Sequence, residues 1–481
     1  MMDLTKAIHF LQRFNGKGRD LFTWRLYNEP CCFVNTFLMK EEMKSMNWKK
    51  AALCVAAGML AVAGITGCGS SGKSASSAAA GKTVEIEYWH VASDSFGGQT
   101  VRELVDEFNK SHPDIKVKEK FNPDMYKGLT QNLQAAVAAG QTPDVVQMGW
   151  DFLYYADENF KHADINKLFA DAGDPNFMKD TFEDNIAKLA QTADGTQVGV
   201  PYSLSVPVLY YNPDIFKEAG LDPDKPPKTW QEVRQYAQTI KDKTGTPAFF
   251  MQEYADTWTN QALVTSNGGE MLKQENGKWK TAFDSPEAAE AYQFIADMVK
   301  DGIGLHATNE EGFQAFTSGK LAMVCTTIGK RANFEKSSKF KVSTTSFPAF
   351  GSKEVKVPAG GNFLMVLSTD PAKQKAAAEF IKFLESADNL TKWDTGTGYL
   401  PPRKNMDKEG PYKKLMDENA NVKKAMETLP HVTPWVSFPG RNGLQAEQVL
   451  IDTRDVVLNG SKTAKEALHD AAVKIDQLLA D

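Results

Sequence analysis

Two short stretches of the sequence combine aromatic rings with carboxylates. One is Trp150-Asp151, and the other is a polar stretch in which Trp258 follows Tyr254 and Asp256. An aromatic ring packs against the apolar CH face of a sugar or polyol, while a carboxylate accepts hydrogen bonds from its hydroxyl groups. These residues therefore indicate binding of a small polar solute. For Trp258, a place in the hydrophobic core is the alternative.

Sequence patterns of common enzymes are missing from the chain. It contains no HExxH, no paired CxxC and no GxSxG. We therefore expect no catalytic residue, no metal and no cofactor. A glycosidase-type pair of carboxyl groups stays open, because a sequence does not fix the distance between them. The histidines that follow residue 68 are scattered without metal-ligand spacing: His90, His112, His162, His306, His431 and His469.

A different chemistry is indicated at Cys68. Two lysines, Lys49 and Lys50, precede about fifteen mostly apolar residues, which end in Ile65-Thr66-Gly67-Cys68. A basic start, an apolar run and small residues before a cleavage point are typical of a secretory signal peptide. The apolar run is short for a permanent membrane span, which needs about 20 residues. The tetrapeptide resembles the processing site of bacterial lipoproteins, which implies that residues 46–67 are removed and Cys68 is acylated. A plain secreted protein with a free cysteine is the alternative.

Residues 1–45 do not fit this pattern, because a lipoprotein signal normally begins the chain. We interpret them as a misassigned start, with translation beginning at Met43 or Met46. Detection of any peptide from residues 1–40 by mass spectrometry would contradict this. Residues 68–81 are small and polar and are expected to form a flexible tether. The globular part, from about residue 82 to 481, is long enough for two domains.

Charge and cysteine content favour an exported, acidic protein. Residues 1–67 hold 9 of the 55 basic and 5 of the 61 acidic residues, so the remainder has a net charge of −10. Nucleic acid is therefore not an expected partner. Cys31, Cys32 and Cys54 are lost on processing, which leaves Cys325 beside the acylated Cys68. No disulfide is then expected within one mature chain.

Strand and helix patterns alternate from Val84 onward, which predicts an α/β fold. Alternating or continuous apolar residues predict strands at 84–88, 115–121, 145–148, 206–211, 321–327 and 363–367. Helix starts are predicted by the capping-box spacings of Thr229 with Glu232 and of Thr463 with Glu466. Ser285-Pro286 and Asp370-Pro371 predict two further starts.

Several motifs in this part resemble family-1 extracellular solute-binding proteins of ABC importers, most of all the branch that binds sn-glycerol 3-phosphate. They are residues 207–212 (PVLYYN), 216–223 (FKEAGLDP), 226–230 (PPKTW), 88–90 (YWH), 360–361 (GG) and 397–401 (TGYLP). The resemblance implies two interleaved α/β lobes joined by hinge crossover strands, of the type II periplasmic-binding-protein kind. The implied lobes are residues 82–203 plus 326–369 and residues 204–325 plus 370–481. The implied crossovers lie near residues 202–206, 323–327 and 369.

The resemblance also implies which residues contact the solute. This chain departs at three places from the branch that binds sn-glycerol 3-phosphate, and these departures bear on which solute it binds. Asp151, behind Trp150, stands one position after the expected glutamate; Thr327 stands where a serine is expected; and the register slips near Arg441. For each residue a packing, turn or surface role is the alternative. The implied binding residues are Tyr126, Asp151, Ser205, Thr327, Gly360, Gly361, Tyr399 and Arg441.

These observations predict a monomeric, lipid-anchored receptor on the outer face of the cytoplasmic membrane. It would capture a small solute between two lobes and deliver it to the membrane subunits of an ABC permease. Glycerol 3-phosphate or a glycerophosphodiester is one expected solute, and a mono- or oligosaccharide is the other. A surface glycan hydrolase or an adhesin is the alternative from a different class.

Overall fold

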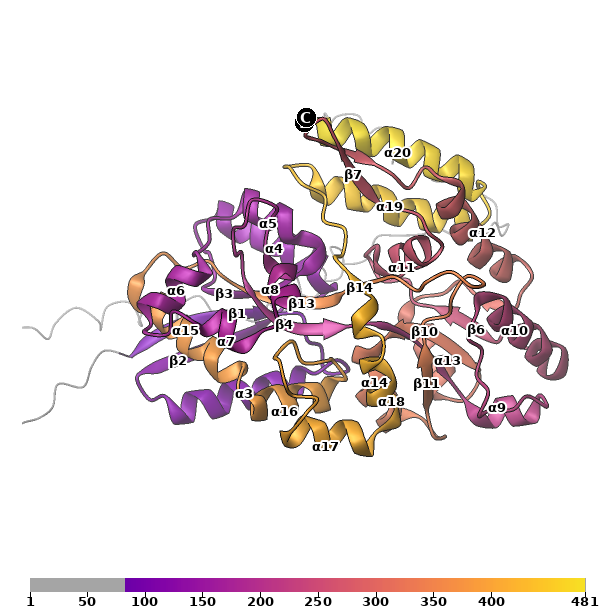
Figure 1. Ribbon diagram of the computed structural model, residues 1–481, viewed down its shortest axis with the longest axis horizontal. Helices are drawn as coiled ribbons and strands as arrows, with labels where there is room; N and C mark the ends of the chain where they lie inside the picture. The colour runs from indigo at the N-terminus through magenta and orange to yellow at the C-terminus, as the bar shows by residue number, and fades with distance from the viewer. Residues whose placement is uncertain (1–82, 481) are drawn as a thin grey trace, which may run out of the picture. The chain divides into compact units, whose positions relative to one another are not determined.

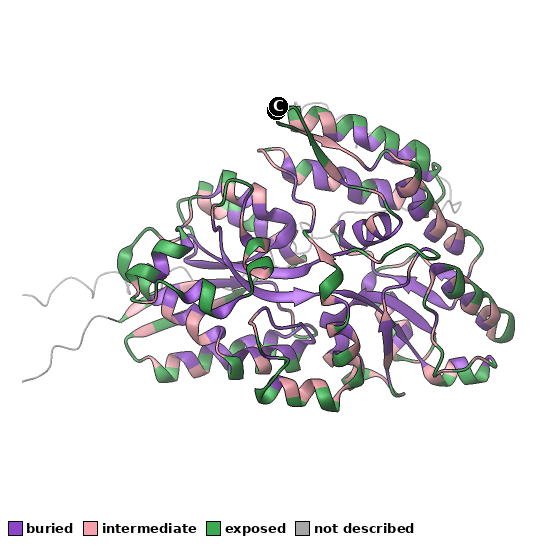
Figure 2. Cartoon of the chain, viewed as in Figure 1, coloured by how far each residue is buried: buried purple, intermediate pink, exposed green. Residues whose placement is uncertain are grey.

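The computed structural model describes residues 83–480 of the chain, and two five-stranded sheets form its framework. Cys68, the signal peptide, the tether and the proposed start of translation lie outside the described residues. In Figure 1 the first sheet lies on the left and the second on the right, each covered by helices. Buried residues concentrate along the strands of both sheets (Figure 2).

The first sheet has the strand order β2-β1-β3-β13-β4. Strands β1, β2 and β3 are mutually parallel, whereas β13 runs antiparallel to β3 and β4. Parallel strands need helical crossovers, which explains the strand–helix alternation of the sequence. The strands are β1 (Val84–His90), β2 (Ile115–Phe121), β3 (Val145–Gly149), β4 (Val200–Ser205) and β13 (Gly360–Val366).

The second sheet has the order β11-β5-β10-β6-β9. Strand β5 runs antiparallel to both of its neighbours, and β10, β6 and β9 are parallel. These strands are β5 (Pro207–Tyr211), β6 (Phe249–Met251), β9 (Gly304–Leu305), β10 (Met323–Thr327) and β11 (Ser343–Ser346). Two small sheets accompany them: β7 (Leu272–Glu275) with β8 (Lys278–Thr281), and β12 (Val357–Pro358) with β14 (Val432–Thr433).

Apolar faces of helices seal both sheets. In α3, the buried residues Val101, Leu104, Val105 and Phe108 are the ones whose spacing predicts the helix. The helices on the side of the first sheet are α3 (Gly98–Ser111), α4 (Met125–Ala138), η1 (Trp150–Phe152), α5 (Leu153–Asn159), α6 (Ile165–Asp171), α7 (Phe177–Thr181), α8 (Asp184–Ala187), η2 (Lys188–Ala190), α15 (Pro371–Leu384) and α16 (Ala387–Thr397).

Helices on the side of the second sheet begin where the capping signals predict. The Thr229–Glu232 capping box and the Ser285 cap before Pro286 are confirmed, as is the reciprocal pairing of Thr463 with Glu466 before α20. These helices are α9 (Pro213–Glu218), α10 (Trp230–Thr244), α11 (Trp258–Ser266), α12 (Pro286–Lys300), α13 (Asn309–Thr317), η3 (Ile328–Lys330) and α14 (Arg331–Ser337). The C-terminal helices are α17 (Gly410–Glu418), which packs on α16 in the core of the first sheet, and α18 (Ala420–Met426), η4 (Leu429–His431), α19 (Gly443–Leu458) and α20 (Ala464–Ala480).

One residue separates the two sheets at the first crossover. Strand β4 ends at Ser205 in the first sheet, and β5 begins at Pro207 in the second, so that Val206 alone joins them. Val206 is fully buried, and its carbonyl accepts a hydrogen bond from the Ile328 amide at 3.0 Å. A link this short leaves few torsions at which one sheet can turn relative to the other.

Two segments pack differently from the lobe division that the resemblance implies. Helix α15, expected with residues 370–481 of the second lobe, packs its apolar face against β1 of the first sheet, and α16 follows it. Strand β11, expected in the first lobe, is an edge strand of the second sheet because it pairs with β5. The chain therefore returns to the first sheet only between Ser346 and Gly360.

Candidate functional site

Most of the site residues predicted from the sequence lie where the two sheets meet. Tyr126 follows β2, and Trp150 and Asp151 follow β3, so these side chains stand at the carboxyl ends of parallel strands. Ligands of α/β proteins commonly bind at this edge of the sheet. Trp258 begins α11, on the side of the second sheet. All four are at least 95% buried.

Two tyrosine hydroxyls meet in the middle of this group. The Tyr126 and Tyr399 hydroxyls lie 3.3 Å apart, and the Asn362 amide donates to the Tyr126 oxygen at 3.1 Å. Just before Tyr126, Asp124 and Met125 adopt left-handed backbone conformations, with φ of 61° and 54°. Such conformations cost roughly 1 kcal/mol or more each and persist where the surrounding packing imposes them. The chain thus holds Tyr126 in a defined position.

Both tryptophan rings are fixed by hydrogen bonds to backbone carbonyls. Trp150 Nε1 donates to the Gly360 carbonyl at 3.1 Å, and Trp258 Nε1 donates to the Pro358 carbonyl at 2.9 Å. A Cβ on Gly360 would lie 2.6 Å from the Trp258 ring, so a glycine is needed there. Gly361 is needed for another reason, since its φ is 102° and a Cβ would lie 2.1 Å from the Ser203 carbonyl.

Carboxyl groups gather next to the aromatic residues. Asp151 and Glu447 are both buried, and each acts on the pKa of the other. Burial, then the charges of Glu447 and Asp256, raises the pKa of Asp151 well above its ordinary value. Burial likewise raises the pKa of Glu447 to about 8 and that of the half-buried Asp256 to about 6.

Three buried oxygens of this group have no hydrogen-bond partner within residues 83–480. They are Oδ1 of Asp151, Oε1 of Glu447 and Oδ1 of Asn362. Native proteins rarely leave such atoms unpaired, because each costs the free energy of desolvation without a compensating bond. The arrangement presents acceptors to a molecule that carries hydroxyl groups.

Ser205 and Thr327 meet at the crossover between the sheets. Their hydroxyl oxygens lie 2.6 Å apart, and the Gly329 amide donates to the Thr327 hydroxyl at 3.0 Å. Ser205 ends a strand of the first sheet and Thr327 ends one of the second. Their contact therefore joins the two sheets beside the crossover, and a role in solute binding stays a prediction for both.

Arg441 stands apart from the buried residues. It is exposed and lies in the loop before α19, two residues ahead of the helix start at Gly443. The described structure does not bring it into the buried group, and its contact with a phosphate stays a prediction.

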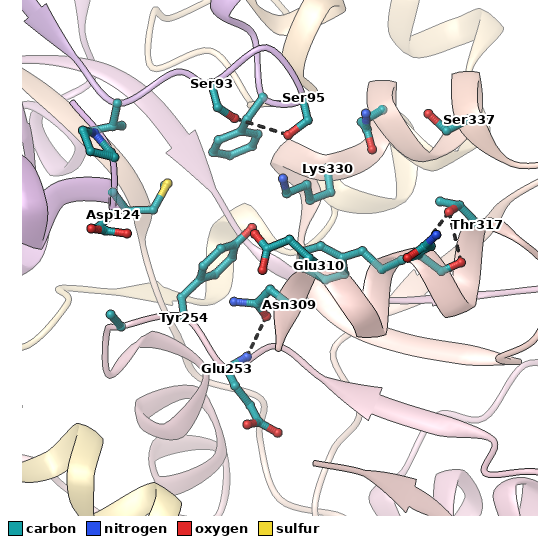
Figure 3. Close-up of a pocket in the computed structure, with 18 of the residues that line it drawn as sticks. Ser93, Ser95, Asp124, Glu253, Tyr254, Asn309, Glu310, Thr317, Lys330 and Ser337 are labelled. Carbon is teal, nitrogen blue, oxygen red and sulfur yellow. Dashed lines mark hydrogen bonds between the residues drawn. The ribbon is translucent and has the colours of Figure 1, made fainter. Parts of the chain in front are cut away.

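An open cavity of about 510 Å³ (Figure 3) is lined by Met125, which precedes Tyr126, and by Phe96, whose ring centre lies 5.4 Å from that of Tyr399. Its walls come from the loops after β1 and β2 on one side, including Ser93, Ser95 and Asp124. From the other side come Tyr254, helix α13 and the start of α14, with Lys330 just before it. The cavity thus lies between elements of the first and second sheets.

Sequence reasoning missed three residues here: Asn362, Glu447 and Lys330. Asn362 is the one amide in the apolar run of β13, and Glu447 lies among Ala446, Val449 and Leu450 on the buried face of α19. A polar residue on an otherwise apolar face is a usable signal for both. Lys330 has no such signal.

Two kinds of structural feature are absent from residues 83–480. No helix among them is long and apolar enough to cross a membrane. Nor do these residues contain a cluster of three or more His, Cys, Asp or Glu side chains that could hold a metal ion.

Comparison with known proteins agrees with this geometry. A family model described as "Bacterial extracellular solute-binding protein" matches residues 94–390. The sn-glycerol-3-phosphate-binding periplasmic protein UgpB of Pectobacterium atrosepticum is 28% identical over 427 residues, which cover 84% of this chain and 93% of that protein.

Solved structures show the same architecture. Maltose-bound MalE3 of T. maritima has a TM-score of 0.73 at 22% identity, covering 82% of this chain and 100% of that one. UgpB of Mycobacterium tuberculosis, in complex with glycerophosphocholine, has a TM-score of 0.71 at 22% identity, covering 83% and 99%. These structures confirm the two-lobe α/β fold, and with the family match they show that the chain belongs to the bacterial extracellular solute-binding proteins.

Proposed function

We propose that this protein captures a small polyhydroxylated solute between its two lobes and hands it to an ABC permease without altering it. The observation that supports this most is the set of unpaired acceptor oxygens of Asp151, Glu447 and Asn362 beside the anchored Trp150 and Trp258. Solute hydroxyls would donate to these oxygens, and CH faces would pack on the indole rings. Tyr126 and Tyr399 would add hydroxyls that both donate and accept.

Hinge bending would close the lobes at the crossover. Val206 joins the sheets, and the Ser205–Thr327 contact lies beside it. We take the first lobe as the first sheet with its helices, α15 and α16 included, and the second lobe as the second sheet with α19 and α20. A solute that contacts both lobes stabilises the closed state by its differential affinity for the two states.

Two solute classes fit this site: glycerol 3-phosphate or a glycerophosphodiester, and a mono- or oligosaccharide. The relatives named above include proteins for both. A glycan hydrolase is the alternative from a different class, and turnover of a glycoside by the purified protein would favour it.

Calorimetry tests the binding proposal. We expect heat with at least one member of a panel of glycerol 3-phosphate, glycerophosphocholine, maltose and glucose. Asp151→Asn should weaken that binding at least tenfold, while exposed Glu183→Gln leaves it unchanged. Chromatography of the recovered solute should show it intact. Absence of heat across the panel, or turnover of a glycoside, would overturn the proposal.

We further propose that Cys68 anchors the mature protein to the cytoplasmic membrane through lipid, with residues 69–81 as the tether. Detergent-phase partitioning and incorporation of labelled palmitate should both be lost in Cys68→Ser. Retention of label in that variant would contradict the anchor. Because a single acyl chain binds membranes reversibly, stable anchoring needs more than one chain.

A further inference from the structure

Lys330 stands out among the residues that line the cavity between the lobes. It ends η3, directly after the crossover strand β10, and it is 93% buried. Its ammonium lies 4.6 Å from the centre of the Phe96 ring and 5.4 Å from that of Phe313. Phe96 comes from the first lobe and Phe313 from the second. Figure 3 shows the side chain directed into the cavity, near Glu310 and Tyr254.

The ammonium of Lys330 has no hydrogen bond or ion pair within residues 83–480; the two ring faces are its partners there. Buried lysines are almost always paired, because removing the charge from water is costly. Burial lowers the pKa of Lys330 to about 8, against the opposing effect of Glu310. The lysine therefore faces an open cavity with its donors unused.

We propose that Lys330 binds an anionic group of the solute, either a phosphate ester or a carboxylate. An ammonium donates up to three hydrogen bonds and binds phosphate as a point charge. The Ser95 hydroxyl and the Asn309 and Asn333 amides line the same cavity and can supply further donors. This inference rests on the proposed function and narrows the solute to a polyol or sugar that carries a negative charge.

The carboxyl groups and Lys330 would then bind opposite ends of the solute. The buried carboxyls of Asp151 and Glu447 repel an anion and accept hydroxyls, so the hydroxyl-bearing end belongs there. The lining residue Met125 directly precedes Tyr126, and the charges of Asp151 and Asp256 act on Tyr126, so the cavity lies near these carboxyl groups. The negative end belongs beside Lys330.

Acidic side chains also line the cavity. Glu253 is paired with His306 at 2.8 Å, whereas Asp124 and Glu310 are exposed. Glu310 acts directly on Lys330 and competes with an anionic solute for it. Removing the charge of Glu310 should therefore strengthen anion binding, whereas removing that of Lys330 should weaken it.

Matched pairs of solutes test the inference by calorimetry: glycerol with glycerol 3-phosphate, and glucose with glucose 6-phosphate and with glucuronate. The wild-type protein should prefer the charged member of at least one pair by tenfold or more. Lys330→Gln should reduce that preference to threefold or less, and Lys330→Arg should retain most of it. Glu310→Gln should increase it. The matched control is Lys336→Gln, an exposed lysine on α14, which should change nothing.

Each result of this calorimetry either supports or overturns the inference about Lys330. Glucose 6-phosphate and glucuronate separate phosphate from carboxylate as the preferred anion. Neutral members that bind as tightly as charged ones, or a preference that survives Lys330→Gln, would overturn the inference and leave the proposed function standing. Absence of binding by every member would overturn both. A melting curve for each variant shows whether it is folded, and the Lys330→Arg and Glu310→Gln results decide the question if Lys330→Gln is not.

Discussion

Replacing Glu447 by glutamine should change how the stability of the solute-free protein depends on pH. Glu447 is 97% buried, and its pKa rises from 4.5 to about 8, chiefly through burial. The folded state therefore binds a proton more tightly than the unfolded state does. It follows that the contribution of Glu447 to the free energy of unfolding is greatest below about pH 4.5 and is lost as the pH rises through 8.

The size of this pH effect follows from the pKa shift of Glu447. Each pKa unit corresponds to about 1.4 kcal/mol, so the full shift sets an upper limit of roughly 5 kcal/mol. Water penetration and the interaction with Asp151 reduce this limit, and we expect about 2–4 kcal/mol between pH 4.5 and 8.5. In Glu447→Gln this loss disappears, because an amide does not ionise and its NH₂ group can donate to Asp151.

Urea unfolding at half-unit steps from pH 4.5 to 8.5 measures the effect. The difference in unfolding free energy between Glu447→Gln and wild type should grow in favour of the variant as the pH rises. Glu183→Gln, an exposed change of the same chemistry, should run parallel to wild type. Parallel curves for wild type and Glu447→Gln would show that burial does not hold a proton on this carboxyl group, and the reasoning about the cluster would be wrong.

Three further changes test the geometry of the site. Gly360→Ala places a Cβ 2.6 Å from the Trp258 ring, so it should cost about 1–3 kcal/mol in thermal or urea unfolding and weaken solute binding at least tenfold in calorimetry. Tyr399→Phe removes one hydroxyl of the pair but leaves Tyr126 bonded to its amide donor, so it should cost only about 1 kcal/mol in urea unfolding. Thr327→Val removes the acceptor of the Gly329 amide, and we expect a cost of about 1–3 kcal/mol, with unchanged stability contradicting the hinge contact.

Local signals in the sequence predicted the elements well. The capping boxes at Thr229 and Thr463 and the apolar spacing of α3 depend on residues within a few positions of one another, and the structure confirms them. Sheet membership depends on distant partners instead. Nothing near residues 343–346 indicates pairing with β5, and nothing near α15 indicates packing on β1.

The candidate site likewise contains residues that the sequence predicted and residues that it missed. Tyr126 and Asp151 were found because the resemblance to the solute-binding family implies them, and the structure places both directly after strands. Glu447 lies almost 300 residues after Asp151, and its contact with that carboxyl depends on α19 packing against α12. Lys330 is notable only for burial beside a cavity, which no short stretch of sequence encodes.

The carboxyl pair also gives a physical reason for closure to depend on solute. Asp151 lies in η1, directly after β3 of the first sheet, whereas Glu447 lies on α19, which packs on α12, a helix on the side of the second sheet. With the lobes apart, water would solvate both groups and each would ionise near its ordinary pKa. Bringing them together then requires a proton or a donor between them, since two adjacent carboxylates repel. In the proposed binding mode, solute hydroxyls would supply such donors to the unpaired oxygens, so the bound molecule would itself offset the electrostatic cost of bringing the lobes together.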